Sequence, residues 1–129
     1  MKSIILYLIF LLLSFFSCSP QSDTVSREEA SAQLQLKLNQ INEFIAEASC
    51  TADGNCAYIP YGSKACGGPQ GYLIYPSAID ETKLEAMVAD YTEAEERYNE
   101  KFGIASDCRI PAPPGELRCE NGICKEAED

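Results

Sequence analysis

Apolar residues recur at helical spacing in two long stretches of this chain, separated and followed by shorter runs typical of strands. The first helical stretch is predicted from about Arg27 to Ala48, with apolar side chains at Leu34, Leu38, Ile41, Phe44 and Ile45. Ser26 and Glu29 precede it as an S-x-x-E capping box, which satisfies free N–H groups at a helix start. One apolar stripe on a polar helix predicts packing against a core, and binding to a partner protein is the alternative.

The second helical stretch has the cleaner stripe, at Leu84, Met87, Val88, Tyr91, Ala94, Tyr98 and Phe102. Thr82 and Glu85 match a second capping box, and Asp80 is an alternative N-cap. Gly103 occupies the place where a glycine commonly ends a helix in the left-handed conformation. We expect the Glu/Lys/Arg-rich outer face of this helix to be solvated rather than to bind a partner.

The segment between the helices predicts an antiparallel hairpin. Ala57–Tyr61 and Tyr72–Tyr75 are rich in Tyr and Ile, which favour strands, and the glycine-rich loop Gly62–Gly71 joins them. Pro60 has no N–H to donate to a neighbouring strand, so the first strand is predicted to lie at an edge or to end there.

The last part of the chain predicts an extended segment followed by a second hairpin. Arg109–Gly115 contains three prolines and favours a polyproline-like conformation. Leu117–Lys125 has Asn-Gly at 121–122, the preferred pair for a two-residue hairpin turn. This register places Cys119 directly opposite Cys124, and it predicts a disulfide between them.

Helix, hairpin, helix, hairpin is the resulting order. It predicts an α+β fold in which two amphipathic helices pack on a small antiparallel sheet, as a small disulfide-stapled domain. The domain is predicted to span residues 26–129 as a single unit, a size that allows one modest hydrophobic core.

A charge-free apolar run, Ile4–Phe16, precedes the domain and follows Lys2. It is shorter than the roughly 20 residues of a membrane-spanning helix, so residues 1–17 are predicted to be a signal peptide. The run ends in F-F-S-C, which resembles the lipobox of bacterial lipoproteins, with Phe15 at the position where leucine is usual. The resemblance implies lipidation of Cys18 and a membrane anchor. Residues 18–25 are polar with one proline, which predicts a flexible tether. Ordinary secretory cleavage, which would leave a free Cys18 thiol, is the alternative.

The cysteine count favours the lipoprotein interpretation. The chain has seven cysteines, and an odd number in a secreted protein calls for an explanation. Lipid on Cys18 leaves an even set that can pair in disulfides, namely Cys50, Cys56, Cys66, Cys108, Cys119 and Cys124. Disulfides persist in oxidising surroundings, so the domain is predicted to lie in an extracytoplasmic compartment of the cell envelope.

Composition excludes several kinds of function. A net charge of −10 argues against nucleic acid as a partner and against membrane binding through a basic face. The chain has no histidine, which removes Ser-His-Asp and Cys-His catalysis and the usual zinc sites. We therefore expect a protein that is not an enzyme and holds neither a metal nor another cofactor; a glycosidase-like carboxylate pair is the remaining catalytic alternative.

Tyrosines in the first predicted hairpin are candidate binding residues: Tyr58, Tyr61, Tyr72 and Tyr75. Alternate residues of a strand face opposite sides of a sheet, so about half of this group is expected in the core. The other half would form an exposed aromatic platform for a glycan or a protein.

The segment from Cys108 to Cys119 suggests a second binding surface. A proline-rich loop that is bounded by cysteines and carries a basic residue looks like the substrate-like loops of small serine-protease inhibitors. In that resemblance Arg109, with Arg118 as the alternative, enters an acidic specificity pocket, and the rigid loop loses little entropy on docking.

The leading hypothesis is a non-catalytic cell-envelope lipoprotein that acts as a binding or accessory module. Its partner would be an envelope protein, a protease or a glycan, and the protease inhibitor is the alternative.

Overall fold

Two helices and two β-hairpins alternate along the chain. The computed structural model describes residues 25–127. In chain order its elements are α2 (Arg27–Ala46), the 3-10 turn η2 (Asp53–Asn55), β1 (Cys56–Tyr61), β2 (Gly71–Pro76), α3 (Glu81–Phe102), β3 (Leu117–Glu120) and β4 (Ile123–Glu126). The predicted α+β class and order of elements are confirmed, with the strands arranged as two separate two-stranded antiparallel sheets.

The predicted signal peptide, residues 1–17, lies outside the described residues, as do Cys18 and the tether residues 19–24. In the described part of the chain, neither helix combines the length and the apolar character needed to cross a membrane.

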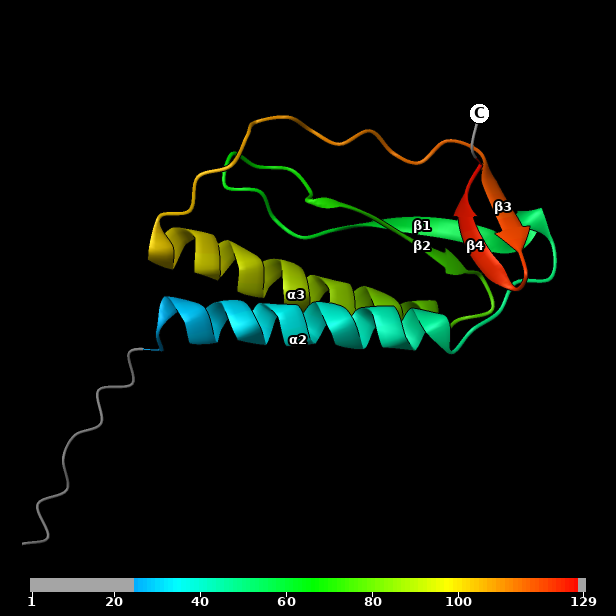
Figure 1. Cartoon of the computed structure of the whole chain (residues 1–129), viewed down its shortest axis with the longest axis horizontal. Helices are drawn as coiled ribbons and strands as arrows, with labels where there is room; N and C mark the ends of the chain where they lie inside the picture. Colours follow the sequence, from blue (N-terminus) through cyan, green and yellow to red (C-terminus); the bar gives the residue numbers. More distant parts are fainter. Residues whose placement is uncertain (1–24, 128–129) are drawn as a thin grey trace, which may run out of the picture.

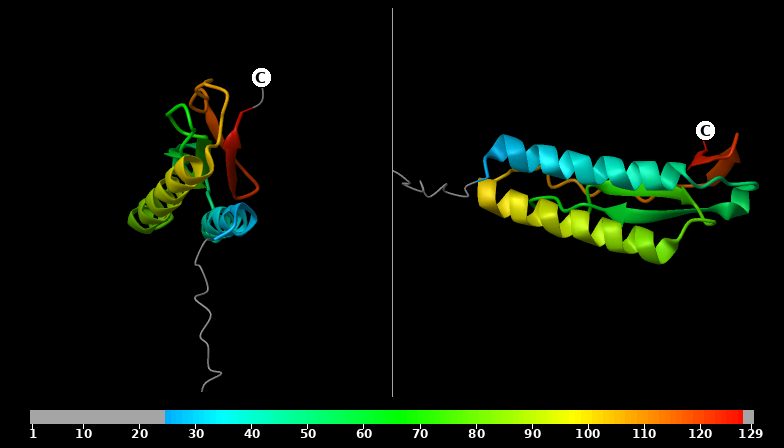
Figure 2. Two further views of the ribbon diagram at one scale, coloured as in Figure 1. Left: turned by 90° about the vertical axis from the view of Figure 1, so that its left-hand side faces the viewer. Right: turned by 90° about the horizontal axis from the view of Figure 1, so that it is seen from below.

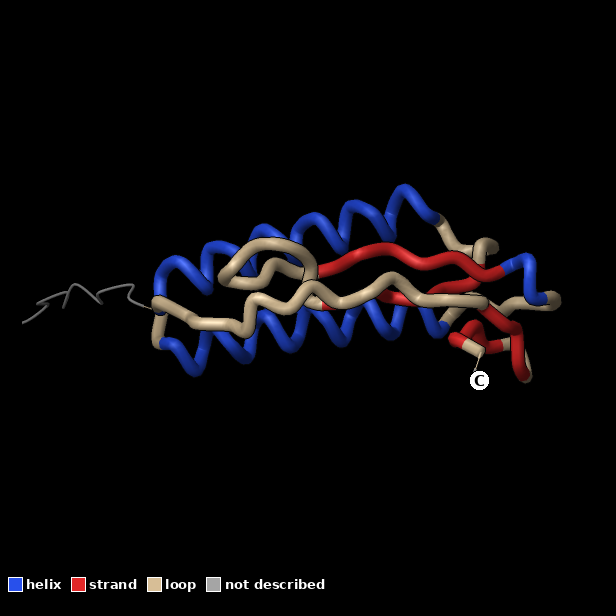
Figure 3. Tube along the Cα trace, turned by 90° about the horizontal axis from the view of Figure 1, so that it is seen from above, coloured by secondary structure: helices blue, strands red, loops and turns tan. Residues whose placement is uncertain are grey.

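The elements stack in layers. α2 and α3 lie side by side and antiparallel, and the β1–β2 hairpin covers one face of this pair (Figures 1 and 2). Residues 104–116, which we call the C-terminal strap, run along the length of the molecule on the other side of that hairpin (Figure 3). The strap leads to the β3–β4 hairpin, which contacts both β1 and β2.

The buried core lies where the strands meet the helices. Its buried side chains come from the second half of α2, from β2 and from the first half of α3: Ile41, Tyr75, Leu84, Val88 and Tyr91. The predicted stripe residues Leu34, Leu38, Phe44, Ile45 and Met87 are partly buried and pack against this cluster. Burying apolar surface in this way is the main favourable term in folding.

Both helix starts are capped, one of them differently from the prediction. At α2 the capping box is present, because the Glu29 amide donates to Ser26 Oγ (3.1 Å) and the Ser26 amide donates to Glu29 Oε2 (3.0 Å). At α3 the proposed Thr82–Glu85 box is wrong, and the alternative N-cap Asp80 accepts from the Lys83 amide at 3.0 Å. An Asp carboxylate reaches the free amides of the first turn as well as a hydroxyl does, and its charge also suits the helix dipole.

The first hairpin presents two different faces. Pairing of Ala57 with Tyr75 and of Ile59 with Leu73 puts these residues, together with Tyr61, on the side that packs against the helices. The second hairpin has the predicted register, with Cys119 opposite Cys124, and its turn residues Asn121 and Gly122 both have positive φ. Gly103 ends α3 in the left-handed conformation, as expected.

The predicted Cys119–Cys124 disulfide is wrong, although the two residues are cross-strand neighbours. Cys119 is bonded to Cys50, and Cys124 is bonded to Cys56, while Cys66 and Cys108 form the third bridge. The β3–β4 hairpin packs on the segment that leads through η2 into β1, where the Cys119 amide donates to Asp53 Oδ1 at 2.8 Å. This contact brings Cys50 and Cys56 within bonding range of the hairpin. Two bridges therefore attach the hairpin to the rest of the domain.

Candidate functional site

The four candidate tyrosines are divided between the two faces of the first hairpin. Tyr61 and Tyr75 lie on the helix side, where the Tyr75 hydroxyl donates to Glu81 Oε1 at 3.3 Å. Tyr58 and Tyr72 form an edge-to-face pair with ring centroids 5.5 Å apart, and Tyr58 is 42% exposed. The four rings thus form no common platform, and glycan or protein binding by the Tyr58–Tyr72 pair stays a prediction.

Arg109 lies in the C-terminal strap with its side chain exposed. Its carbonyl oxygen accepts a hydrogen bond from Lys64 Nζ at 2.6 Å, and the same ammonium group pairs with the Asp107 carboxylate. The strap is attached to the Gly62–Gly71 loop through the bridge between Cys108 and Cys66, and Cys119 in β3 is bonded to Cys50 instead. The segment is therefore held down on the domain at Arg109, and it is not a loop closed by one disulfide.

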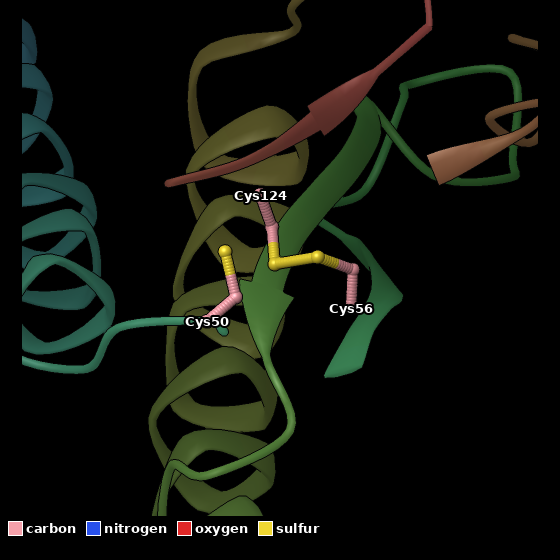
Figure 4. A group of neighbouring side chains, drawn as sticks. All are labelled: Cys50, Cys56 and Cys124. Carbon is pink, nitrogen blue, oxygen red and sulfur yellow. A yellow bond between two sulfur atoms is a disulfide. The ribbon is translucent and has the colours of Figure 1, made fainter. Parts of the chain in front are cut away.

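Three cysteine sulfurs gather at the junction of the two hairpins. The sulfurs of Cys50, Cys56 and Cys124 lie within 4.8 Å of one another, and the Cys50 sulfur lies beside the Cys56–Cys124 bridge (Figure 4). Each of these sulfurs is in a disulfide, whereas a metal requires the thiolate form. In this oxidised state the group holds the hairpins together.

A cleft opens between α2 and α3, next to the loop that joins β1 and β2. β1 and β2 cover the half of the helix pair that contains the core, and the loop between them extends over the other half (Figure 1). The cleft has a volume of about 320 Å³ and is lined by Ser31, Leu34, Gln35, Leu38, Asn39, Gln70, Tyr91, Glu95, Tyr98, Asn99 and Ile104. It combines apolar side chains with several amides and one carboxylate.

Glu95 is the centre of the hydrogen bonds in this cleft. Its Oε1 accepts from the Tyr91 hydroxyl at 3.2 Å and from Gln70 Nε2 at 3.3 Å. Its Oε2 accepts from the Ser63 amide at 2.7 Å. Since three donors from two elements point at this carboxylate, its position is well defined.

Neighbouring polar residues of α3 hold the same loop. Thr92 Oγ1 accepts from the Gly62 amide at 3.0 Å, and Asn99 Nδ2 donates to the Ser63 carbonyl at 2.7 Å. Thr92, Glu95 and Asn99 are spaced three and four residues apart, so they lie on one helix face. This face fixes the loop that forms one wall of the cleft.

Burial and a neighbouring charge raise the pKa of Tyr91, one of the tyrosines that line the cleft. Desolvation raises the pKa of Tyr91 well above its usual value, and the charge of Glu95 and the hydrogen bond to it raise the pKa further. Each of these favours the neutral phenol over the phenolate. Tyr91 is therefore a stable hydrogen-bond donor to Glu95 at neutral pH.

The position of Glu95 in the sequence indicates that it faces the core, although we predicted the acidic side chains of this helix to lie on a solvated face. The apolar stripe of α3 runs through Leu84, Val88 and Tyr91 to Tyr98, and helical spacing places position 95 in that stripe. An acidic residue at a core-facing position requires hydrogen-bond partners, and here the loop supplies them.

Comparisons with protein-family models, with curated proteins and with solved structures find no match to this chain.

Proposed function

We propose that this protein is a non-catalytic, lipid-anchored binding or accessory module of the cell envelope. The observation that carries the proposal is the pairing of six of the seven cysteines in three disulfides. Disulfides persist in oxidising extracytoplasmic compartments. The pairing leaves Cys18 as the one cysteine for lipid, at the end of an apolar segment of signal-peptide length.

The cleft supports binding rather than catalysis. A concave site with apolar walls and a few fixed polar groups is the usual form of a small-molecule site. Among the described residues that line it, Glu95 is the one carboxylate, whereas glycosidases use a pair. With no histidine in the chain, a general base of the usual kind is also missing.

Mass spectrometry of the protein extracted from membranes with detergent tests the lipid anchor. We expect an N-terminal peptide that begins at Cys18 and carries the mass of lipid. The Cys18→Ala variant should lose that lipid and be absent from carbonate-washed membranes, whereas Gln21→Ala should behave as the wild type. A mature chain with a free Cys18 thiol would contradict the proposal.

The protease-inhibitor alternative has one observation in its favour, the exposure of Arg109 and of Ile110, which is 71% exposed. The Lys64 contact argues against it, because a serine protease must bind the carbonyl of the specificity residue in its oxyanion hole. Inhibition of a trypsin-like protease that is lost in Arg109→Ala and kept in Arg118→Ala would favour the inhibitor. Absence of inhibition by the folded wild-type protein would exclude it for that class of protease.

A further inference from the structure

We propose that the α2–α3 cleft binds one neutral sugar ring. This inference rests on the proposed function as a binding module, and it names the site and the class of ligand. The hydrogen-bonding groups of the cleft, its aromatic wall and its charge each limit the ligand.

The size and the walls of the cleft suit a single ring. A volume of about 320 Å³ is at the small end of the roughly 300–1,000 Å³ of known ligand sites. Tyr98 and Leu34 line the cleft beyond the buried core, and both are only partly buried in the described structure. An aromatic ring beside an aliphatic side chain offers a surface for the C–H face of a sugar.

The polar groups of the cleft match hydroxyl groups. Gln35 and Asn39 project from α2, and Gln70 and Asn99 approach from the loop and from α3. A side-chain amide both donates and accepts hydrogen bonds, as a sugar hydroxyl does. Gln35 and Asn39 are exposed, so their amides are open to a ligand.

Charge excludes acidic ligands from the cleft. Among the described residues that line it, none is a lysine or an arginine, and Glu95 carries the one formal charge. A carboxylate or phosphate on the ligand would be repelled by Glu95, and none of the described lining residues offers it a cation.

The ligand does not need a positive charge to balance Glu95 either. Glu95 already accepts hydrogen bonds from Ser63, Gln70 and Tyr91, which stabilise its negative charge within the protein. Because these donors hold Glu95 in place before any ligand arrives, a neutral hydroxyl can meet a preorganised acceptor at low entropic cost. A neutral, hydroxyl-rich ring therefore fits better than an acidic or a basic one.

Saturation-transfer NMR tests the inference directly. The sample is the mature chain from residue 18 with Cys18→Ser, which stays in solution without lipid, and the probes are N-acetylglucosamine, glucose and glucuronate. We expect transfer to the ring protons of at least one neutral sugar and none to glucuronate. Transfer to neither neutral sugar, or equal transfer to glucuronate, would overturn the inference.

Two exposed glutamines of α2 provide a matched pair of variants. Gln35 lines the cleft, whereas Gln40 is also exposed on α2 but lies outside the cleft lining. Loss of one hydrogen bond to the ligand should weaken sugar binding about fivefold in Gln35→Ala. Binding should be unchanged in Gln40→Ala, and an equal loss in both variants would place the sugar elsewhere.

The outcome of these measurements is independent of the lipid anchor. Circular dichroism of each variant shows whether it is folded, and both changes to Ala favour the helix. Lipid on Cys18 together with no sugar binding would reject only the sugar site. Sugar binding by the Cys18→Ser sample, together with a wild-type chain whose Cys18 carries no lipid, would reject only the membrane anchor.

Discussion

Gly62 and Glu95 approach each other so closely that a side chain at position 62 has no room. A Cβ on Gly62 would lie 2.5 Å from Glu95 Oε2, and the glycine has a φ of +77°. Its own amide donates to Thr92, and the next amide, that of Ser63, donates to Glu95. The absence of a side chain at Gly62 is what lets the loop backbone reach the carboxylate.

Gly62→Ala should therefore destabilise the fold by about 2 kcal/mol or more, from the positive φ and from overpacking. Urea denaturation followed by circular dichroism measures this free energy of unfolding. Gly54→Ala is the control, because a Cβ there meets no atom within 4 Å, and we expect a change within about 0.5 kcal/mol. Equal effects of the two changes would contradict the close packing of Gly62 against Glu95.

Peptide mapping without reduction should find Cys50 linked to Cys119 and Cys56 linked to Cys124. Cleavage before Asp53 separates Cys50 from Cys56, and cleavage after Glu120 separates Cys119 from Cys124. The resulting fragments distinguish the pairings by mass. Each bridge should stabilise the fold by about 2–4 kcal/mol. A fragment that joins Cys119 to Cys124 would refute the pairing seen in the structure.

Stability should fall as the pH rises above the ordinary tyrosine pKa of 10.0, because the pKa of Tyr91 is raised in the folded chain. Above this pH the unfolded chain releases the phenolic proton while the folded chain retains it, so alkaline pH favours unfolding. Below the unfolded pKa the contribution of Tyr91 is fully present. Urea denaturation at pH 8 and pH 11 measures the difference.

Tyr91→Phe should show a smaller loss between these two pH values than the wild type. At pH 8 it should be less stable by about 1 kcal/mol, because the hydrogen bond to Glu95 is gone. Tyr58→Phe removes an exposed hydroxyl and should follow the wild type at both pH values. Parallel losses in Tyr91→Phe and the wild type would show that Tyr91 does not cause the alkaline sensitivity.

Local patterns in the sequence were sufficient to predict the elements. The spacing of Ile41 with its apolar neighbours, the Ser26–Glu29 box and Gly103 act within a few residues, so they predict the helices without knowledge of the rest. The Asn121-Gly122 turn similarly determines the register of β3 and β4. For the start of α3, where Asp80 and Thr82 were both plausible, the structure was needed to decide.

Contacts between residues far apart in the chain were decided only by the tertiary structure. Cys119 and Cys124 are neighbours across a hairpin, yet their bonding partners precede them by 69 and 68 residues. Besides Tyr91 on the same helix, the donors to Glu95 come from a loop 32 and 25 residues earlier, at Ser63 and Gln70. Sequence alone thus specified where helices and strands form, because that depends on local spacing. The pairing of cysteines and the shape of the cleft depend on how those elements pack, which no local pattern records.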